Sequence, residues 1–159
     1  MFFPFKDLPG HSRIWIYQSS RFFTEDEVTQ IKELSYEFVN NWTSHKMTLH
    51  ASAEIFHNLF LVLAVDEQVN DTGGCSIDTA FQFVQYLEKL LNIKLLDRMQ
   101  LATSIQHNIE TGNLSESIER IKNATHPVFV FNNLISTKQQ LQTEWLQPVE
   151  ESWVMQMMS

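Results

Sequence analysis

The sequence feature that most restricts the fold is a run of seven consecutive apolar residues, 59–65, the longest such run in the chain. A helix that spans a membrane needs about 20 apolar residues, so this run is too short to cross a bilayer. A short, unbroken apolar run is typical of a strand that is covered on both faces. We therefore expect a central strand at 59–65 and no membrane insertion.

Two other segments are predicted to be strands. In residues 49–55 apolar and polar side chains alternate, as in a strand with one face in water. Residues 56–58 can then turn the chain, so that the two strands form a hairpin. Residues 12–18 are β-branched and aromatic, and they are apolar on both faces near their centre, which predicts an interior strand.

Two amphipathic helices are predicted beside these strands. The first runs from Thr24 to about Trp42 and begins with a capping box, in which the side chains of Thr24 and Glu27 bond to each other's backbone amides. The second carries an apolar stripe with helical spacing, with Ser76 as its expected N-cap and Asn92 near its C-terminus. Each helix would bury one face against the sheet.

The order of these elements predicts the fold class. Alternating apolar residues at 99–105 indicate a fourth strand, which completes the order β-α-β-β-α-β over a core at about 12–105. This is the order of the ferredoxin-like fold, an α+β architecture in which an antiparallel-rich sheet carries helices mainly on one face. With a length of 159 residues, we expect a single α+β domain, 1–159.

A C-terminal αβα extension, about 113–159, is predicted to follow this core. A short helix is expected at 115–122 and a strand at 127–131. A further helix begins near Ser136, where Ser136 and Gln139 could form a capping box, and Pro148 should end it.

The charge and cysteine content of the chain exclude several partners. There are 11 Lys and Arg against 19 Asp and Glu, a formal net charge of −8. Surfaces that bind phosphates need clustered Lys and Arg, and the sequence has no such cluster, so we expect no nucleic acid partner. One cysteine cannot close an intrachain disulfide, and the N-terminal residues lack the features of a signal peptide. These observations predict a cytoplasmic protein.

The densest group of candidate functional residues lies in residues 66–78, which we call the acidic loop. The candidates are Asp66, Glu67, Asp71, Cys75 and Asp78. No Lys or Arg occurs between positions 46 and 89, so we expect a negative field that repels phosphates. Arginines that fold in from distant segments would contradict this expectation.

Three kinds of chemistry are considered for the acidic loop. Cys75 precedes a helix N-terminus, whose dipole can activate a thiolate nucleophile, although nearby carboxylates disfavour the charged sulfur. Asp66, Asp71 and Asp78 could offer oxygen ligands to a divalent metal such as Mg²⁺ or Ca²⁺, without the spacing of an EF-hand. The glycines at 73 and 74 belong to no phosphate-binding motif, so ATPase activity is not supported and no cofactor is predicted.

Two further features bear on binding. Asn132 and Asn133 follow the predicted strand 127–131 and could hydrogen-bond a ligand, so we expect a pocket where the acidic loop meets them. The apolar tail around Trp153 needs a surface to pack on, which makes a homodimer through this tail or an open sheet edge an alternative. The sequence favours a non-catalytic module that binds a small ligand or a protein partner. The alternative is an enzyme that uses Cys75 as nucleophile or a divalent metal in the acidic loop.

Short segments spread from about Phe5 to Trp153 carry a resemblance to a known family. They are Phe5-Lys6-Asp7-Leu8-Pro9, Arg13-Ile14-Trp15-Ile16-Tyr17-Gln18, Ala64-Val65-Asp66-Glu67, Gly74-Cys75-Ser76-Ile77-Asp78, Asp97-Arg98, Phe131-Asn132-Asn133-Leu134 and Ser152-Trp153. In these segments the chain resembles an uncharacterised family of small bacterial proteins, best known from the Bacteroidetes and often labelled "ABC transporter ATPase". That label does not describe this chain, which has no phosphate loop and no Walker lysine. The resemblance implies a cytosolic bacterial protein and carries over no catalytic residues.

Overall fold

The computed structural model describes residues 1–158 and shows an α+β fold with two main antiparallel sheets. The first sheet has the strand order β1 (Arg13–Gln18), β5 (Phe60–Val65), β4 (Ala51–Phe56). The second has the order β7 (Asn108–Asn113), β6 (Gln100–Ile105), β8 (Val128–Phe131), β9 (Leu146–Pro148). A small ribbon joins β2 (Thr43–Ser44) and β3 (Met47–Thr48). The helices are α1 (Glu25–Asn40), α2 (Gly74–Leu91), α3 (Leu114–Lys122), α4 (Lys138–Glu144) and α5 (Val154–Met158), with 3₁₀ turns at Phe5–Asp7 and Val149–Glu151.

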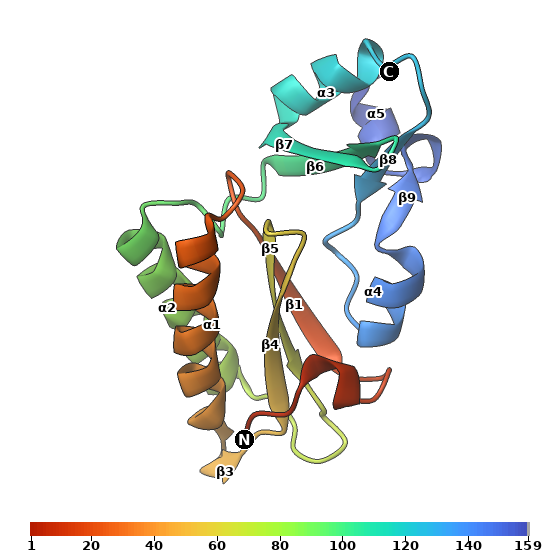
Figure 1. Ribbon diagram of the computed structural model, residues 1–159. Coiled ribbons are helices and arrows are strands. Elements are labelled where there is room, and N and C mark those ends of the chain that lie inside the picture. Colours follow the sequence, from red (N-terminus) through yellow and green to blue (C-terminus); the bar gives the residue numbers. More distant parts are fainter. Residues whose placement is uncertain (159) are drawn as a thin grey trace.

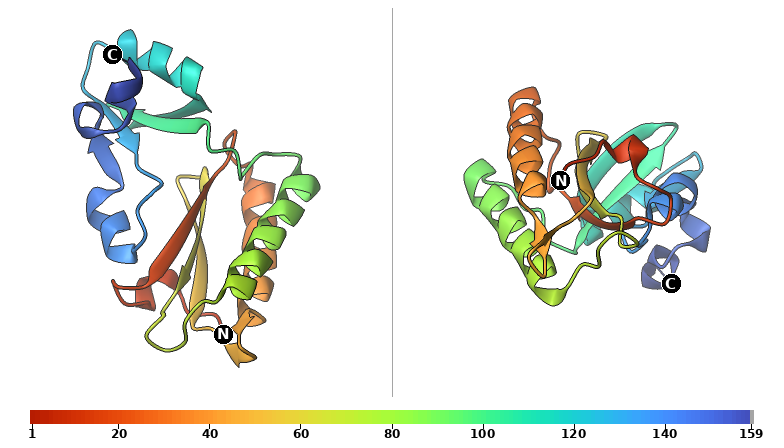
Figure 2. Two further views of the ribbon diagram at one scale, coloured as in Figure 1. Left: turned by 180° about the vertical axis from the view of Figure 1, so that it is seen from behind. Right: turned by 90° about the horizontal axis from the view of Figure 1, so that it is seen from below.

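The apolar run expected to form a central strand does so as β5, which lies between β1 and β4 with every residue buried. The predicted hairpin is also confirmed: β4 and β5 pair from Ala51 opposite Val65 to Phe56 opposite Phe60. His57 and Asn58 make its turn with φ values of 55° and 51°. Helices α1 and α2 lie side by side on one face of this sheet (Figure 1, Figure 2). Within residues 1–158, none of the helices combines the length and the apolar character that a membrane crossing requires.

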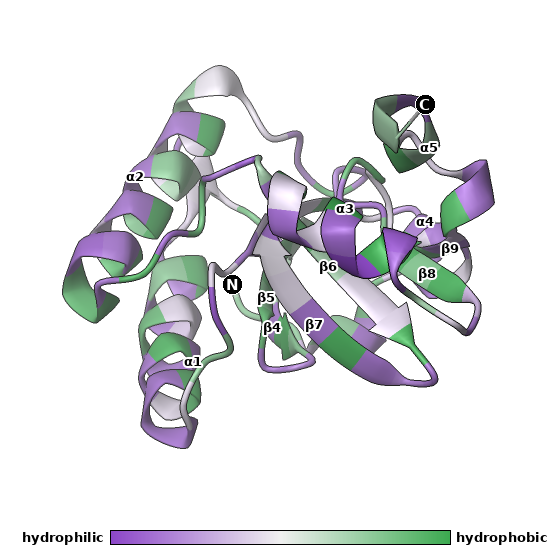
Figure 3. Cartoon of the chain, turned by 90° about the horizontal axis from the view of Figure 1, so that it is seen from above, coloured by the Kyte–Doolittle hydropathy of each residue, from purple (hydrophilic) through white to green (hydrophobic). Residues whose placement is uncertain are grey.

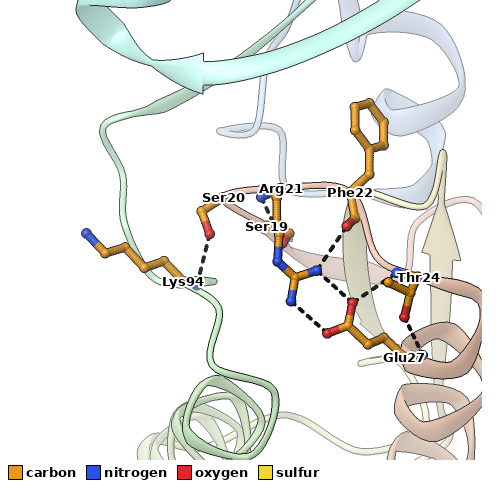
Figure 4. Close-up of polar contacts among 7 residues, drawn as sticks. All are labelled: Ser19, Ser20, Arg21, Phe22, Thr24, Glu27 and Lys94. Atoms are coloured by element: carbon orange, nitrogen blue, oxygen red, sulfur yellow. Dashed lines mark hydrogen bonds and ion pairs between the residues drawn. The ribbon is translucent and has the colours of Figure 1, made fainter.

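Helix α1 begins as its sequence predicts. The Thr24 hydroxyl accepts from the Glu27 backbone N–H at 3.1 Å, and the Glu27 carboxylate accepts from the Thr24 backbone N–H at 2.9 Å. The same carboxylate accepts two hydrogen bonds from the Arg21 guanidinium, at 2.7 and 2.8 Å (Figure 4). The first turn of α1 is therefore closed both by a capping box and by a bidentate ion pair.

Helix α2 begins earlier than predicted. Its N-cap is Gly73, not Ser76, and the Ser76 hydroxyl instead donates to the Thr43 carbonyl at 2.7 Å, which ties the helix to β2. The expectation that Ser76 caps the helix was wrong because this side chain serves a tertiary contact. Asn92 does lie at the C-terminal end, in the left-handed conformation with φ of 52°.

Strand β1 was predicted to be interior, and this was wrong, because β1 is an edge strand of the first sheet. Its outer edge is bonded near its start, where the Ile14 N–H donates to the Ser136 carbonyl at 2.9 Å. The apolar residues of β1 are explained by contacts on its two faces, not by an interior position in the sheet. Ile14 packs into the core between the two sheets, whereas Trp15 lies beneath the helices, 6.0 Å from Trp42 between ring centroids. Both faces of β1 are thus covered although one edge is open.

The ferredoxin-like order is not confirmed, because the fourth predicted strand, β6, pairs in the second sheet. Its neighbour β7 was not predicted, since β7 is polar and only one of its residues is buried. The helix expected from Ser136 begins one residue later, with Thr137 and Gln140 forming the capping box. It ends at Glu144, so Pro148 lies in β9 and does not terminate the helix.

The second sheet has its own core on the face covered by α3 and α5 (Figure 3). Leu101, Val130 and Val154 are among the residues buried there. The tail around Trp153 therefore docks on the chain itself through Val154, which is fully buried, while the Trp153 side chain stays 42% exposed.

The other face of each sheet contributes to a shared core between them. Three aromatic rings meet there: Phe60 of β5, Phe131 of β8, and Trp145 directly after α4, with ring centroids 4.7 to 5.0 Å apart. Lys138 of α4 is also buried, and its ammonium group donates to the carbonyls of three residues near the N-terminus. These are Phe5 at 2.7 Å, Lys6 at 3.1 Å and Leu8 at 2.7 Å. This contact fastens α4 to the N-terminal segment that packs on the first sheet.

Candidate functional site

The first two carboxylates of the acidic loop maintain the loop's own structure. Asp66 Oδ1 lies 3.0 Å from His11 Nε2 and accepts from the Gln68 N–H at 3.1 Å. Glu67 accepts from the Thr72 N–H at 2.9 Å. These oxygens are therefore occupied by contacts within the chain.

The expected negative field of the acidic loop is partly neutralised, which corrects the sequence-based expectation. The Arg13 guanidinium comes from the start of β1 and lies 3.8 Å from the Glu67 carboxylate. β1 and β5 are antiparallel, with Arg13 opposite Val65. Arg13 therefore lies beside the end of β5, where the acidic loop begins. The sequence interval without Lys or Arg could not show this, because the cation belongs to a distant segment.

The other loop candidates lie at the surface. Asp71 and Asp78 are exposed, and Cys75 is exposed in the first turn of α2. Within residues 1–158, no three His, Cys, Asp or Glu side chains are grouped so that they could hold a metal ion. Asp66 and Glu67 thus contact His11 and Arg13, which are distant in the sequence. The loop candidates do not come together in one site.

Asn132 and Asn133 lie away from the acidic loop. The Asn133 amide donates to Gln18 Oε1 at 2.9 Å, and its own oxygen accepts from the Trp145 indole N–H at 2.9 Å. Gln18 pairs with Phe60 at one end of β5, whereas Asp66 follows the other end. The acidic loop and Asn133 are therefore separated by the length of β5 (Figure 1), and the pocket expected between them is not formed.

A pocket of about 500 Å³ lies instead between the two sheets, and we call it the junction pocket. It is lined by His57, Ser104, His107, Ile109, Phe131, Leu141, Gln142, Thr143, Trp145 and Leu146. These residues come from the β4–β5 turn, the inner face of the second sheet, the β6–β7 turn and α4. Four separate parts of the fold thus converge on one hollow, which is the usual setting of a small-molecule site.

The aromatic wall of the junction pocket is held in place by its neighbours. The Trp145 ring is fixed by its hydrogen bond to Asn133 and by edge contacts with Phe60 and Phe131. His57 lies beside the same rings, 5.5 Å from Phe131 and 5.7 Å from Trp145 between centroids. This partial burial lowers the pKa of His57 below 6.5, because the apolar surroundings disfavour the charged imidazolium. His57 is therefore neutral near pH 7.

Several polar side chains in the junction pocket have no bonding partner in the chain. Ser104 is only 7% exposed, yet its hydroxyl makes no hydrogen bond with any residue in 1–158. The side chains of His57, His107 and Gln142, which are exposed, likewise make none with the described residues. Water can therefore bond to these three in the free protein, whereas the Ser104 side chain is largely buried; all four groups are available to a ligand.

A second hollow of similar size lies between α1 and α2, and two of its polar side chains are bonded within the chain. Phe38 and Phe83 line it and stack on each other at 4.3 Å. The Asn41 amide donates to the Glu37 carbonyl at 2.9 Å, and the Thr79 hydroxyl donates to the Cys75 carbonyl at 2.8 Å. The junction pocket differs from this hollow in having no Asp or Glu in its lining and in drawing on both sheets and α4, and we take it as the candidate site.

His57 and His107 were not predicted as site residues, because no sequence spacing relates them. Both lie at tight turns with positive φ, 55° and 66°. His57 falls in the predicted turn 56–58, which was a usable signal, whereas His107 belongs to a hairpin that was not predicted. Comparison of the chain with known proteins finds no matching family model, no matching curated protein and no matching solved structure.

Proposed function

We propose that this protein is a non-catalytic binding module that holds a small ligand in the junction pocket. The observation that carries the proposal is the convergence of unbonded polar side chains, above all the buried Ser104, on a hollow walled by Phe131 and Trp145. An apolar, largely preformed cavity with a few polar groups is the common form of a small-molecule site. The ligand has a flat apolar part that packs on the aromatic wall and polar atoms that bond to the turn and helix side chains.

The enzyme alternative lacks comparable support. Cys75 is exposed on α2, outside the residues that line either hollow. The carboxylates of the acidic loop are exposed or bonded within the chain. Two further statements stay predictions within this proposal. They are the cytoplasmic location and the relation to the bacterial family that the chain resembles.

The proposal can be tested with flat aromatic probes by two-dimensional amide NMR. Naphthamide, naphthoate and naphthylmethylamine share one ring system and differ in charge. At about 1 mM, where even weak ligands bind, at least one probe should shift the indole N–H signal of Trp145 and the backbone amides of residues 57, 107 and 142. The Trp42 indole signal, from beneath α1 and α2, serves as the internal control.

A blocked pocket supplies the matched control. Leu146 lines the junction pocket and is 45% exposed, so Leu146→Trp should fill the hollow and abolish the shifts. Leu134 is 79% exposed and does not line the pocket, so Leu134→Trp should bind as the wild type does. If no probe shifts the pocket signals, or if Leu146→Trp binds equally well, the junction pocket is not the binding site.

A further inference from the structure

The distribution of charge distinguishes the junction pocket from the rest of the molecule. The protein has a formal net charge of −8, and its acidic loop and the groove between α1 and α2 both contain carboxylates. No Asp or Glu lines the junction pocket, where the titratable residues are His57 and His107. A hollow free of carboxylates in a strongly acidic protein offers a negative ligand one of the few places without direct repulsion.

The nearest carboxylates in sequence are directed elsewhere. Glu110 follows the lining residue Ile109 on β7, so its side chain points to the opposite face, where it forms an ion pair with Arg120 of α3. Glu144 precedes Trp145 at the end of α4, but it is exposed and does not line the pocket.

The polar groups of the junction pocket are also suited to an anion. The Gln142 amide, the Ser104 hydroxyl and a ring N–H of each histidine are donors, and none of these side chains bonds to another residue in 1–158. An ionised carboxylate only accepts hydrogen bonds and has about four positions for them. Hydrogen bonds to an ionised acceptor are about twice as strong as those between neutral groups.

We infer that the ligand of the junction pocket is an organic anion, a carboxylate on a flat apolar body, with its charge held by His57 and His107. This inference rests on the proposed function and adds the chemical class of the ligand. The apolar body lies against Phe131, Trp145 and Leu146, and the carboxylate faces the two hairpin turns. A histidine ring presents at least one N–H donor to a carboxylate oxygen in either protonation state, so the contact does not require a charged imidazolium.

The naphthalene probes test the charge directly, with affinities measured by NMR titration at one pH. Naphthoate should bind about tenfold more tightly than naphthamide, which has the same shape without the charge, because a charge-assisted bond replaces a neutral one. Naphthylmethylamine, the cation, should bind most weakly. If naphthamide or the amine binds as tightly as naphthoate, the inference is wrong while the proposed function stands. If none binds in the pocket, both are wrong.

Histidine variants identify the groups responsible. His57→Asn with His107→Asn keeps residues that tolerate positive φ, so the turns should still form. The double variant should lose the preference and bind naphthoate about as weakly as naphthamide, while its affinity for naphthamide stays within about twofold of the wild type. Unchanged naphthamide binding shows that the pocket is intact.

The matched control is His45→Asn, which changes a histidine at a positive φ of 52° in the β2–β3 turn, outside the pocket. It should keep the wild-type preference for naphthoate. A double pocket variant that retains that preference would overturn the assignment to His57 and His107.

Discussion

At the scale of single residues, a bidentate ion pair joins Arg21 to Glu27 at the start of α1. The Arg21 guanidinium bonds both carboxylate oxygens, and the Thr24 backbone N–H adds a third bond (Figure 4). These bonds favour the ionised carboxylate, with the guanidinium contributing most, and they lower the pKa of Glu27 from its ordinary value of 4.5 to about 2. The folded state therefore binds the Glu27 proton more weakly than the unfolded chain does.

This difference predicts how stability depends on pH. The contribution of Glu27 is complete above about pH 4.5 and is lost as the pH falls through about 2, because the carboxylate must then be protonated. Glu27→Gln should lower the free energy of unfolding at pH 7, and the difference from the wild type should shrink steadily between pH 4.5 and 2. Denaturant titrations of both proteins at several pH values measure this difference in the free energy of unfolding.

A carboxylate on the same helix provides the control for this experiment. Glu33 is exposed and forms no ion pair with the residues in 1–158, so Glu33→Gln should follow the wild-type profile over the whole range. A Glu27→Gln profile parallel to that of the wild type would contradict the role of the Arg21 contact.

At the scale of elements, the two turns that border the junction pocket are under local strain. His57 and His107 take positive φ, a conformation that costs most residues other than glycine and asparagine about 1 kcal/mol or more. Hairpin turns of this kind prefer Asn-Gly, so glycine would fit these positions with less strain than histidine does.

The strain predicts opposite effects on stability and binding. His107→Gly should raise the free energy of unfolding by about 0.5–1 kcal/mol, since glycine adopts positive φ without steric cost. The same change should weaken naphthoate binding several-fold. Lys46→Gly, at φ of 66° in the β2–β3 turn, should bring a similar stabilisation with no change in binding. Chemical denaturation and NMR titration of the two variants give both quantities, and equal binding by His107→Gly would contradict the proposed role of His107.

The elements that the sequence predicts well are those specified by neighbouring residues. The capping box at Thr24 and the apolar run of β5 act within a few positions, and both were located correctly. Strand β7 was missed because its polar side chains resemble a loop until β6 pairs with it. Helix α2 was misplaced at its start because Ser76 bonds to a residue 33 positions away.

At the scale of the whole molecule, the site could not be predicted because it depends on which sheet each strand joins. The pattern of 99–105 indicates a strand correctly but does not say that it pairs with β7 and β8. That pairing brings His107 and His57 to one pocket and leaves Asn133 and the acidic loop at opposite ends of β5. The location of a pocket between two sheets is a property of long-range packing, which no local pattern records.

The two sheets should nevertheless behave as one cooperative unit, because they share the core around Phe60, Phe131 and Trp145. Lys138 reinforces this core through three carbonyl contacts near the N-terminus. Lys138→Met leaves those carbonyls without a donor, so it should lower the free energy of unfolding by about 2–4 kcal/mol. Lys122 is exposed at the end of α3, and Lys122→Met should change stability by less than about 0.5 kcal/mol.

Hydrogen exchange shows whether this loss reaches both sheets. If the chain is a single domain, the most protected amides of β5 and those of β6 should lose protection by the same free energy in Lys138→Met, since both exchange through global unfolding. The core between the sheets is built from residues of both, and neither can lose it alone without exposing aromatic surface of the other. A loss confined to the second sheet would show that β6–β9 unfold separately. The junction pocket would then lie between two domains rather than inside one.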